Sequence, residues 1–198
     1  MTITQIRQQK NGRFAIYIDG EYALSVDSRT LNDSCLSKGG VITLPQLNEL
    51  RETAEFRTAN DRAMTILSYR DHSKEELRRK LSRTVGEEQA EKAAEHMEEL
   101  GLIDDAEYAA KLARELLETR LMGDSRALYE MTKRGIDRET AENAIDEANS
   151  DPGERISRFL SKKYPGWDDD EKVRRRALAA LSRNGFKWED VRRVIDEY

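Results

Sequence analysis

One pattern of apolar, polar and glycine positions occurs three times along this chain. Residues 127–147 and 177–197 share it at an offset of fifty residues: an Ala-Leu pair, a hydroxyl–base dyad, a glycine, a hydrophobic residue and a second apolar row. A third copy over 77–97 keeps the apolar spacing, with a one-residue insertion near Gly86. A long fixed period indicates a repeat architecture in which neighbouring units cover each other's apolar faces. Such an array favours an extended binding surface over a closed catalytic pocket.

We predict three helices in each repeat. Ser73 and Glu76 have the spacing of a capping box at the start of a second helix. Gly135 and Gly185 are predicted to end second helices in the left-handed conformation, each followed by a hydrophobic residue that packs back. The second helices are predicted to begin near Ser73, within 123–125 and within 168–170. The third helices carry apolar rows with i, i+3, i+4 spacing: Ala90, Ala93, Ala94 and Met97; Ala141, Ala144, Ile145 and Ala148; Val191, Val194, Ile195 and Tyr198.

The N-terminal residues follow a different pattern. Over 2–26, β-branched and aromatic residues form short runs separated by Asn-Gly and Asp-Gly, which are strong signals for hairpin turns. We predict a three-stranded antiparallel meander here and a short helix within 28–37. Thr43 is a good N-cap with Pro45 in the first turn, and no glycine or proline interrupts the segment that follows. A long helix is therefore predicted from about Pro45 to Tyr69.

These elements define the predicted fold class. It is mainly α, an elongated array of three tandem three-helix repeats preceded by a small N-terminal antiparallel β element. The predicted boundaries are 1–57 for the β element and helical linker, 58–103 for repeat 1, 104–150 for repeat 2 and 151–198 for repeat 3.

The composition agrees with an extended helical protein. Hydrophobic and charged residues each make up 37% of the chain, against about 25% charged residues in typical soluble domains. High charge is also typical of disordered chains, but the regular apolar spacing argues against disorder. The net charge of −5 weakly disfavours non-specific nucleic-acid binding. Repeat 2 is the acidic one (7 basic and 12 acidic residues), and repeat 3 is slightly basic (12 and 10).

The sequence contains no signal for export or for membrane insertion. The single Cys35 excludes an internal disulfide framework and suits a reducing compartment. No apolar run approaches the length of a membrane span, and the β-patterned N-terminus is unlike a signal peptide. We therefore expect a cytoplasmic protein.

A basic residue recurs at one position of the repeat, in the dyads Ser82-Arg83, Thr132-Lys133 and Ser182-Arg183. Stacked repeats would align these bases in a row, suited to an acidic protein surface or to phosphates. Alternatively, each base complements a helix dipole in the last turn, which is worth roughly 0.3–1 kcal/mol. Basic triplets lie nearby, although such runs are usually solvated helix faces. The binding candidates are Arg78, Arg79, Lys80, Arg83, Lys133, Arg134, Arg174, Arg175, Arg176 and Arg183.

No constellation of residues indicates catalysis or metal binding. The two histidines, His72 and His96, form no cluster of metal-ligand spacing with Cys35. A Gly-rich phosphate loop, a nucleophile elbow and an HExxH motif are all missing from the sequence. We predict that the protein is not an enzyme and needs neither a metal nor a cofactor of its own.

Other residues with chemical potential have structural explanations. Asp104 and Asp105 follow a glycine-containing turn and are interpreted as the cap of the next helix rather than as paired catalytic carboxylates. Tyr108 then belongs to the packed face of that helix. Trp167 and Trp188 could stack on bases, but packing between helices is the preferred interpretation.

Several segments, in order and at matching spacing, resemble the bacterial RecX regulatory proteins. The resemblance covers residues from about 58 to 198, with a weaker match over the N-terminus. The matching motifs are Arg70-x-His72-Ser73-x-x-Glu76-Leu77-x-x-Lys80-Leu81, Leu100-Gly101-x-Ile103-Asp104-Asp105-x-x-Tyr108-Ala109, Gly135-Ile136 and Arg183-x-Gly185-Phe186.

The resemblance implies a regulatory protein that binds RecA and its filament on single-stranded DNA. Members of this family typically inhibit the recombinase, ATPase and coprotease activities of RecA, and thereby regulate DNA repair and the SOS response. A monomer that lodges along the filament groove is expected. A member close to DNA would be more basic than this chain, so the acidity favours contact with RecA over direct contact with DNA.

Two other functions are compatible with the residues themselves. Three-helix units can resemble helix-turn-helix domains, so the repeats could bind DNA directly; that binding would weaken steeply with salt. The array could also be a scaffold for an unrelated protein, which a pull-down would identify.

Overall fold

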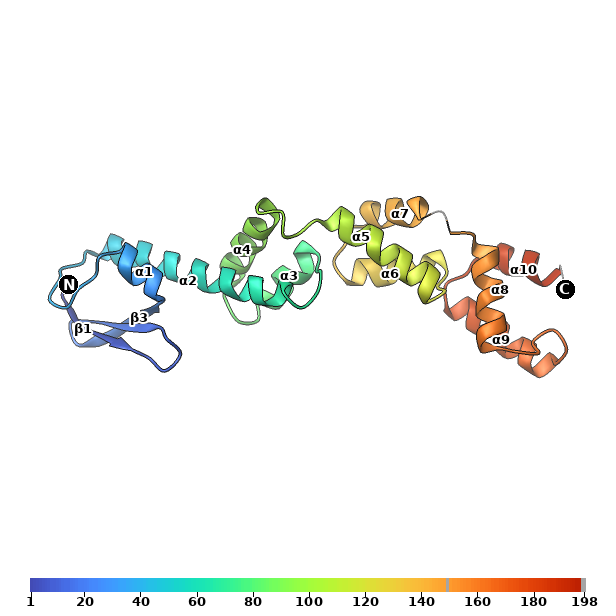
Figure 1. Ribbon diagram of the computed structural model, residues 1–198, viewed down its shortest axis with the longest axis horizontal. Helices are drawn as coiled ribbons and strands as arrows, with labels where there is room; N and C mark the ends of the chain where they lie inside the picture. Colours follow the sequence, from blue (N-terminus) through green and yellow to red (C-terminus); the bar gives the residue numbers. More distant parts are fainter. Residues whose placement is uncertain (149, 197–198) are drawn as a thin grey trace. The chain divides into compact units, whose positions relative to one another are not determined.

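A small sheet at the N-terminal end is followed by helices along the rest of the chain, as Figure 1 shows. The computed structural model describes residues 1–148 and 150–196. The chain forms two compact units, which we call the N-terminal unit (residues 1–68 with 78–97) and the C-terminal unit (residues 69–77 with 98–198). The predicted fold class, tandem three-helix repeats after a small β element, is confirmed. The predicted repeat boundaries stay predictions.

The N-terminal sheet consists of β1 (Ile3–Gln8), β2 (Phe14–Ile18) and β3 (Glu21–Val26), antiparallel in the order β1-β2-β3. Asp19 and Gly20 form the tight turn between β2 and β3, with positive φ angles of 50° and 92°. A type I′ turn requires two positive φ angles, and Asp-Gly is a favoured pair for it. The predicted three-stranded meander is therefore confirmed.

The long helix α2 (Leu44–Leu67) packs against the sheet and continues into repeat 1. Thr43 caps it in a capping box with Gln46. The predicted helix is confirmed, although it ends at Leu67, two residues earlier than expected. One buried cluster unites α2 with the strands and includes Leu47, Leu50, Ala54, Ile16 and Val26.

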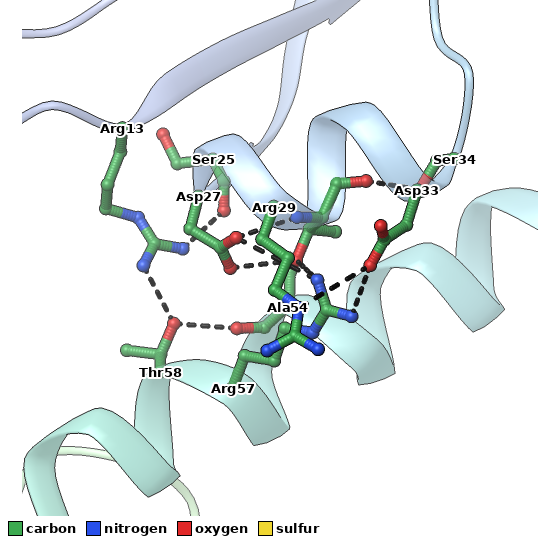
Figure 2. A network of polar contacts seen from close by, with 10 residues as sticks. Arg13, Ser25, Asp27, Arg29, Asp33, Ser34, Ala54, Arg57 and Thr58 are labelled. Atoms are coloured by element: carbon green, nitrogen blue, oxygen red, sulfur yellow. Dashed lines mark hydrogen bonds and ion pairs between the residues drawn. The ribbon is translucent and has the colours of Figure 1, made fainter.

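A polar network, shown in Figure 2, ties the short helix α1 (Ser28–Asp33) to α2. The Asp27 carboxylate caps α1 and accepts hydrogen bonds from Thr30 N at 2.7 Å and Thr30 Oγ1 at 2.8 Å. Arg57 of α2 donates to Thr30 Oγ1 at 2.9 Å and to Asp33 at 2.7 Å. Burial alone would raise the pKa of Asp27, but the Thr30 hydrogen bonds and the Arg57 charge outweigh it and lower the pKa. The short helix predicted here is confirmed.

The remaining helices supply the repeats, and the boundary between the two units falls inside α3. The predicted apolar rows of the third helices are buried or half-buried in α4, α7 and α10, and Tyr198 lies outside the described residues. No described helix combines the length and the apolarity that crossing a bilayer requires. The helices are α3 (Lys74–Leu81), α4 (Glu87–Glu99), α5 (Asp105–Arg114), the π-helical turn η1 (Glu115–Thr119), α6 (Asp124–Lys133), α7 (Arg138–Glu147), α8 (Pro152–Lys163), α9 (Glu171–Arg183) and α10 (Trp188–Asp196).

The two tryptophans differ in burial. Trp167, in the loop before α9, is 7% exposed and belongs to the buried cluster of repeat 3, so its predicted packing role is confirmed. Trp188 is 61% exposed, and the prediction that it packs between helices is wrong. It is the first residue of α10 and corresponds, at an offset of fifty, to the exposed Arg138 that begins α7. A side chain at this position projects beyond the buried row that starts at Val191.

The glycine caps predicted for the second helices are present. Gly135 follows α6 and Gly185 follows α9, with φ angles of 85° and 81°. The next residues, Ile136 and Phe186, each donate their backbone N–H to the carbonyl five residues earlier, at 3.3 Å, and their side chains are buried. This is the Schellman arrangement, in which an αL residue lets the chain turn back and satisfy the last carbonyls.

We predict that alanine is tolerated much less at Gly185 than at Gly101. Both glycines have positive φ, so alanine is strained at either position. A Cβ at Gly185 would also lie 2.4 Å from Arg126 N, whereas one at Gly101 would meet no atom within 4 Å. Gly101→Ala should lower the free energy of unfolding by about 1–2 kcal/mol, and Gly185→Ala by about 2–5 kcal/mol, measured by urea titration. Equal losses would rule out a close backbone contact at Gly185.

Candidate functional site

Successive second helices of the C-terminal unit meet end to end at a recurring contact, which we call the joint. Ser73, just before α3, donates its hydroxyl to the carbonyl of Arg134, the C-cap of α6, at 2.5 Å. Gly123, the N-cap of α6, donates its N–H to the carbonyl of Asn184, the C-cap of α9, at 2.8 Å. The N-terminus of one helix thus satisfies a carbonyl at the C-terminus of the next. Both pairs are 61 residues apart in sequence.

The second joint brings two backbones into direct contact. A Cβ at Gly123 would lie 2.2 Å from the carbonyl carbon of Gly185, so only glycine fits at this position. The Asn184 side chain reinforces the contact by donating to the carbonyl of Leu121 at 2.7 Å. Leu121 is buried and has a positive φ of 54°, a strained conformation for a bulky residue. It follows the π-helical turn η1, and such turns are frequent at functional sites.

A charged residue from the first helix of the following repeat completes each joint. At the first, the Asp105 carboxylate of α5 accepts from the backbone N–H of Lys74 at 2.9 Å. At the second, Arg155 of α8 donates to Asp124 at 2.7 Å and to the carbonyl of Met122 at 2.6 Å. Positions 105 and 155, like 74 and 124, are fifty residues apart. The same place in the repeat therefore holds an acid in one joint and a base in the other.

The two residues that complete the joints are both withdrawn from solvent. Burial raises the pKa of Asp105, the hydrogen bond from Lys74 N lowers it, and the nearby Glu98 and Asp137 charges raise it further; the net effect is a raised pKa. Arg155 is 2% exposed, and its guanidinium carbon lies 5.8 Å from the centre of the Phe186 ring.

The joints determine where two of the recurring bases lie. Lys133 and Arg183 are the last residues of α6 and α9. Each directly precedes a C-cap residue, Arg134 or Asn184, whose carbonyl accepts the hydrogen bond of a joint. The predicted position in the last helical turn is confirmed for these two and is wrong for Arg83. Helix α3 ends at Leu81, and the N–H groups of residues 84 and 85 both turn back to the Leu81 carbonyl. Arg83 consequently lies in the turn after the helix.

Several of the candidate bases make contacts within the chain. Arg78 forms ion pairs with Glu87 and, at 3.5 Å, with Glu91 of α4. Arg134 donates to the Tyr108 hydroxyl at 3.2 Å. Arg175 forms an exposed i, i+4 pair with Glu171 at 2.9 Å, a kind that contributes little to stability.

The other candidates differ in how far they are exposed. Arg79 and Lys133 are exposed, and Lys80 is half-buried. Within the described residues, the side chains of four of the candidate arginines make no hydrogen bond or ion pair: Arg83, Arg174, Arg176 and Arg183. Arg83 belongs to the N-terminal unit and the other three to the C-terminal unit. The single row of bases therefore stays a prediction.

A basic cleft on α8 does not stand out in the sequence. It has a volume of about 450 Å³ and contains Arg158 and Lys162 together with the hydroxyls of Ser157, Ser161 and Thr119. The Ser-Arg and Ser-Lys pairs are four residues apart, so they share one helix face. This i, i+4 repetition is the signal that could have identified them. Cation and hydroxyl side chains on one face suit an anion such as phosphate.

We predict that Asp105→Asn stabilises the protein in a pH-dependent way. The amide keeps the acceptor for Lys74 N without burying a charge. The pKa of Asp105 is higher in the folded protein than in the unfolded chain. The protonated side chain therefore adds stability at a pH below the ordinary aspartate pKa, and this stability is lost as the pH rises through the pKa of the folded state. Asp105→Asn should therefore raise the free energy of unfolding at neutral pH, with a gain that vanishes in acid.

The control is Asp27→Asn, because the pKa of Asp27 is lowered rather than raised. This variant should lose stability at neutral pH, and the loss should also disappear in acid. Urea unfolding of both variants between about pH 3 and pH 8 measures the two signs. The same sign for both variants would refute the assignment of a charge penalty to Asp105.

Comparisons with known proteins agree with this architecture. The family model described as "Regulatory protein RecX N-terminal domain" matches residues 1–43, and "RecX, second three-helix domain" matches residues 104–145. The regulatory protein RecX of Clostridioides difficile (strain 630) is 26% identical, over 98% of this chain and 94% of the relative. The one of Prosthecochloris aestuarii (strain DSM 271 / SK 413) is 31% identical, over 73% of this chain and 95% of the relative.

Two solved structures share the fold. The crystal structure of a regulatory protein RecX superimposes with a TM-score of 0.70 at 24% identity, covering 98% of both chains. That of RecX from Lactobacillus salivarius gives a TM-score of 0.61 at 23% identity, covering 72% of this chain and 96% of the other. The matched second repeat, the matched N-terminal element and the 31% identity to a nearly fully covered relative lead to one conclusion: the chain belongs to the RecX family of regulatory proteins.

Proposed function

We propose that this protein binds RecA and its filament on single-stranded DNA and inhibits RecA. Membership of a family of regulatory proteins supports a regulatory role in general. The observation that carries the proposal is the recurring joint, which places a base, Lys133 or Arg183, directly before the contact between successive second helices. Repeated contacts of this kind suit a partner that is itself repetitive, such as a filament of identical protomers.

The proposed mechanism is steric. The helical repeats lodge along the groove of the filament and contact successive RecA protomers. An occupied groove hinders entry of duplex DNA, cleavage of a repressor and extension of the filament, so the recombinase, ATPase and coprotease activities all fall. The nucleotide and the catalysis belong to RecA, and regulation of DNA repair and of the SOS response follows from this inhibition.

Within the repeats, we assign the partner contacts to the bases that the fold leaves exposed. Arg83, Lys133 and Arg183 are the first choice, followed by the exposed Arg176 and the half-buried Arg174 of α9. Their guanidinium and ammonium groups suit acidic side chains on RecA. Arg78 and Arg134 are the less favoured candidates, because their side chains are half-buried.

We expect the purified protein, added at up to one molecule per RecA protomer, to reduce both DNA-dependent ATP hydrolysis and strand exchange by RecA. Both activities are measured on filaments formed on circular single-stranded DNA. Unchanged rates of both activities at this ratio would overturn the inhibitor proposal.

The basic positions are tested by combining Arg83→Glu, Lys133→Glu and Arg183→Glu. We expect at least about a tenfold higher concentration for half-inhibition, corresponding to about 1.4 kcal/mol of lost binding free energy. The control combines Arg7→Glu, Lys10→Glu and Lys38→Glu, three exposed positions of the N-terminal unit with the same change of charge. Circular dichroism verifies that helicity is retained in both.

The helix-dipole alternative makes a different prediction for the same residues. Lys133→Glu and Arg183→Glu should each lower the free energy of unfolding by about 0.3–1 kcal/mol, because they end helices, and Arg83→Glu should lower it less. If the folded triple variant inhibits RecA at the same concentration as the unmodified protein, the three bases do not contact the partner. Lys133 and Arg183 then only stabilise the ends of their helices.

Direct DNA binding is the second candidate function, and the cleft on α8 favours it. Arg158 and Lys162 line this cleft with three hydroxyls and without a carboxylate. Binding of a labelled oligonucleotide in the absence of RecA should then weaken steeply between about 50 and 200 mM salt, and Arg158→Glu with Lys162→Glu should abolish it. No binding at low salt would exclude this function.

A further inference from the structure

The N-terminal unit contains a cleft that the proposed function does not use. Its volume is about 400 Å³. Strand β3, the middle of α2 and the segment from Thr84 to Gln89 form its walls. All of these residues lie within the N-terminal unit. The cleft is therefore a feature of this unit alone.

Positive charge is concentrated in this cleft. Arg13, Arg51 and Arg62 line it with a single acid, Glu55, although the whole chain carries a net charge of −5. Figure 2 shows Arg13 between the sheet and α2, where it donates to Ser25 O at 2.7 Å and to Thr58 Oγ1 at 2.9 Å.

Among the residues that the structure describes, no carboxylate forms an ion pair with any of these three arginines. The partners of Arg13 are uncharged, and Arg62 donates to the uncharged carbonyl of Thr84 at 2.7 Å. Within the described residues, Arg51 makes neither a hydrogen bond nor an ion pair. Guanidinium groups bind carboxylates strongly, so an occupant with negative charge matches this cleft.

The cleft also borders the open edge of the sheet. β3 is an edge strand, and four consecutive residues, from Tyr22 to Ser25, line the cleft. Since successive side chains of a strand point to opposite faces, a run of four indicates that the strand edge itself borders the cleft. In the described chain, β3 forms no backbone–backbone hydrogen bond on that side, although its Ser25 carbonyl accepts one from the Arg13 side chain at 2.7 Å. On the opposite edge of the sheet, Ile3 exchanges two hydrogen bonds with Gly39 and Gly40.

Gln89 supplies an unused acceptor at the same place. It is 8% exposed, lines the cleft, and its Oε1 atom is buried with no hydrogen-bond partner in the described residues. A buried acceptor without a donor costs about 1–3 kcal/mol, so a ligand that provides an N–H group gains from this site.

We propose that this cleft binds an extended acidic segment of a protein partner, which adds to the β3 edge as a further strand. Its backbone N–H and C=O groups pair with β3 and supply the donor for Gln89, and its carboxylates neutralise the three arginines. The sugar–phosphate backbone of DNA carries acceptors alone, so it would satisfy the arginines but neither Gln89 Oε1 nor the strand carbonyls. None of the candidate bases lines this cleft, although Arg83 directly precedes Thr84 of its wall. The test of the cleft does not involve RecA.

The probe is a fluorescein-labelled decapeptide of alternating Glu and Val, acetylated and amidated, titrated with the full-length protein and followed by fluorescence anisotropy. The unmodified protein should bind it, and Arg51→Glu should weaken binding at least about tenfold, because Arg51 makes no contact that the fold needs. Arg7→Glu, an equal charge change on the exposed β1, should leave the affinity within about twofold. A matched Lys-Val decapeptide should not bind.

Strand addition is tested by methylating the peptide nitrogens. Only alternate N–H groups of an added strand face its neighbour. Methylation of one alternate set of peptide nitrogens should therefore abolish binding, and methylation of the other set should preserve it. Gln89→Leu should reduce peptide binding without lowering the free energy of unfolding, since it removes an unsatisfied buried acceptor.

Three outcomes would overturn the proposal. One is no binding of the Glu-Val peptide at millimolar concentration, and another is equal binding by the protein with Arg51→Glu. The third is a single-stranded oligonucleotide that binds more tightly than the peptide and competes with it, which would assign the cleft to nucleic acid. Equal effects of methylating the two alternate sets of nitrogens would show that the peptide does not add to β3 as a strand.

Discussion

The contact between helix ends is the constraint on which the C-terminal unit depends. A helix leaves N–H donors unpaired at its start and carbonyl acceptors unpaired at its end, and these ends carry opposite partial charges. Here Ser73 donates to Arg134 O and Gly123 N donates to Asn184 O, so each end provides what the other lacks. The end of each second helix of this unit is thereby fixed against the next, and α6 and α9 also contribute buried residues such as Met131 and Leu181 to the cores of their repeats.

The two joints solve one geometric problem with different residues. A serine hydroxyl bridges the first, and a half-buried acid from α5 caps the helix there. In the second, Gly123 and Gly185 bring the backbones into contact, and the buried base Arg155 balances an acid on the helix itself. The first helix supplies the acid in one joint (Asp105) and the base in the other (Arg155), and the contact between the helix ends is present in both. Repeats of one fold can therefore diverge in sequence without losing their stacking.

Much of this architecture can be predicted from the sequence. The β meander, the long α2, the capping residues Thr43 and Asp104, and the αL glycines after α6 and α9 all occur where the sequence predicts them. Each depends on residues within a few positions of one another. Two expectations failed, those for Trp188 and Arg83, and both concern the end of a helix. There the neighbouring elements, rather than the periodicity, decide exposure and helix length.

The sequence by itself determined the repeat period, the helix caps, the apolar rows and the set of bases available for binding. The tertiary structure alone decided that Arg78 pairs with glutamates of α4 and that Arg51 and Arg62 line one cleft with β3. It also decided that Gly123 meets Gly185, across 62 positions of the chain. The physical reason is the separation in sequence between the residues that interact. Caps and amphipathic rows arise from contacts within about one or two helical turns, whereas joints, ion pairs and clefts depend on distances between elements far apart in sequence.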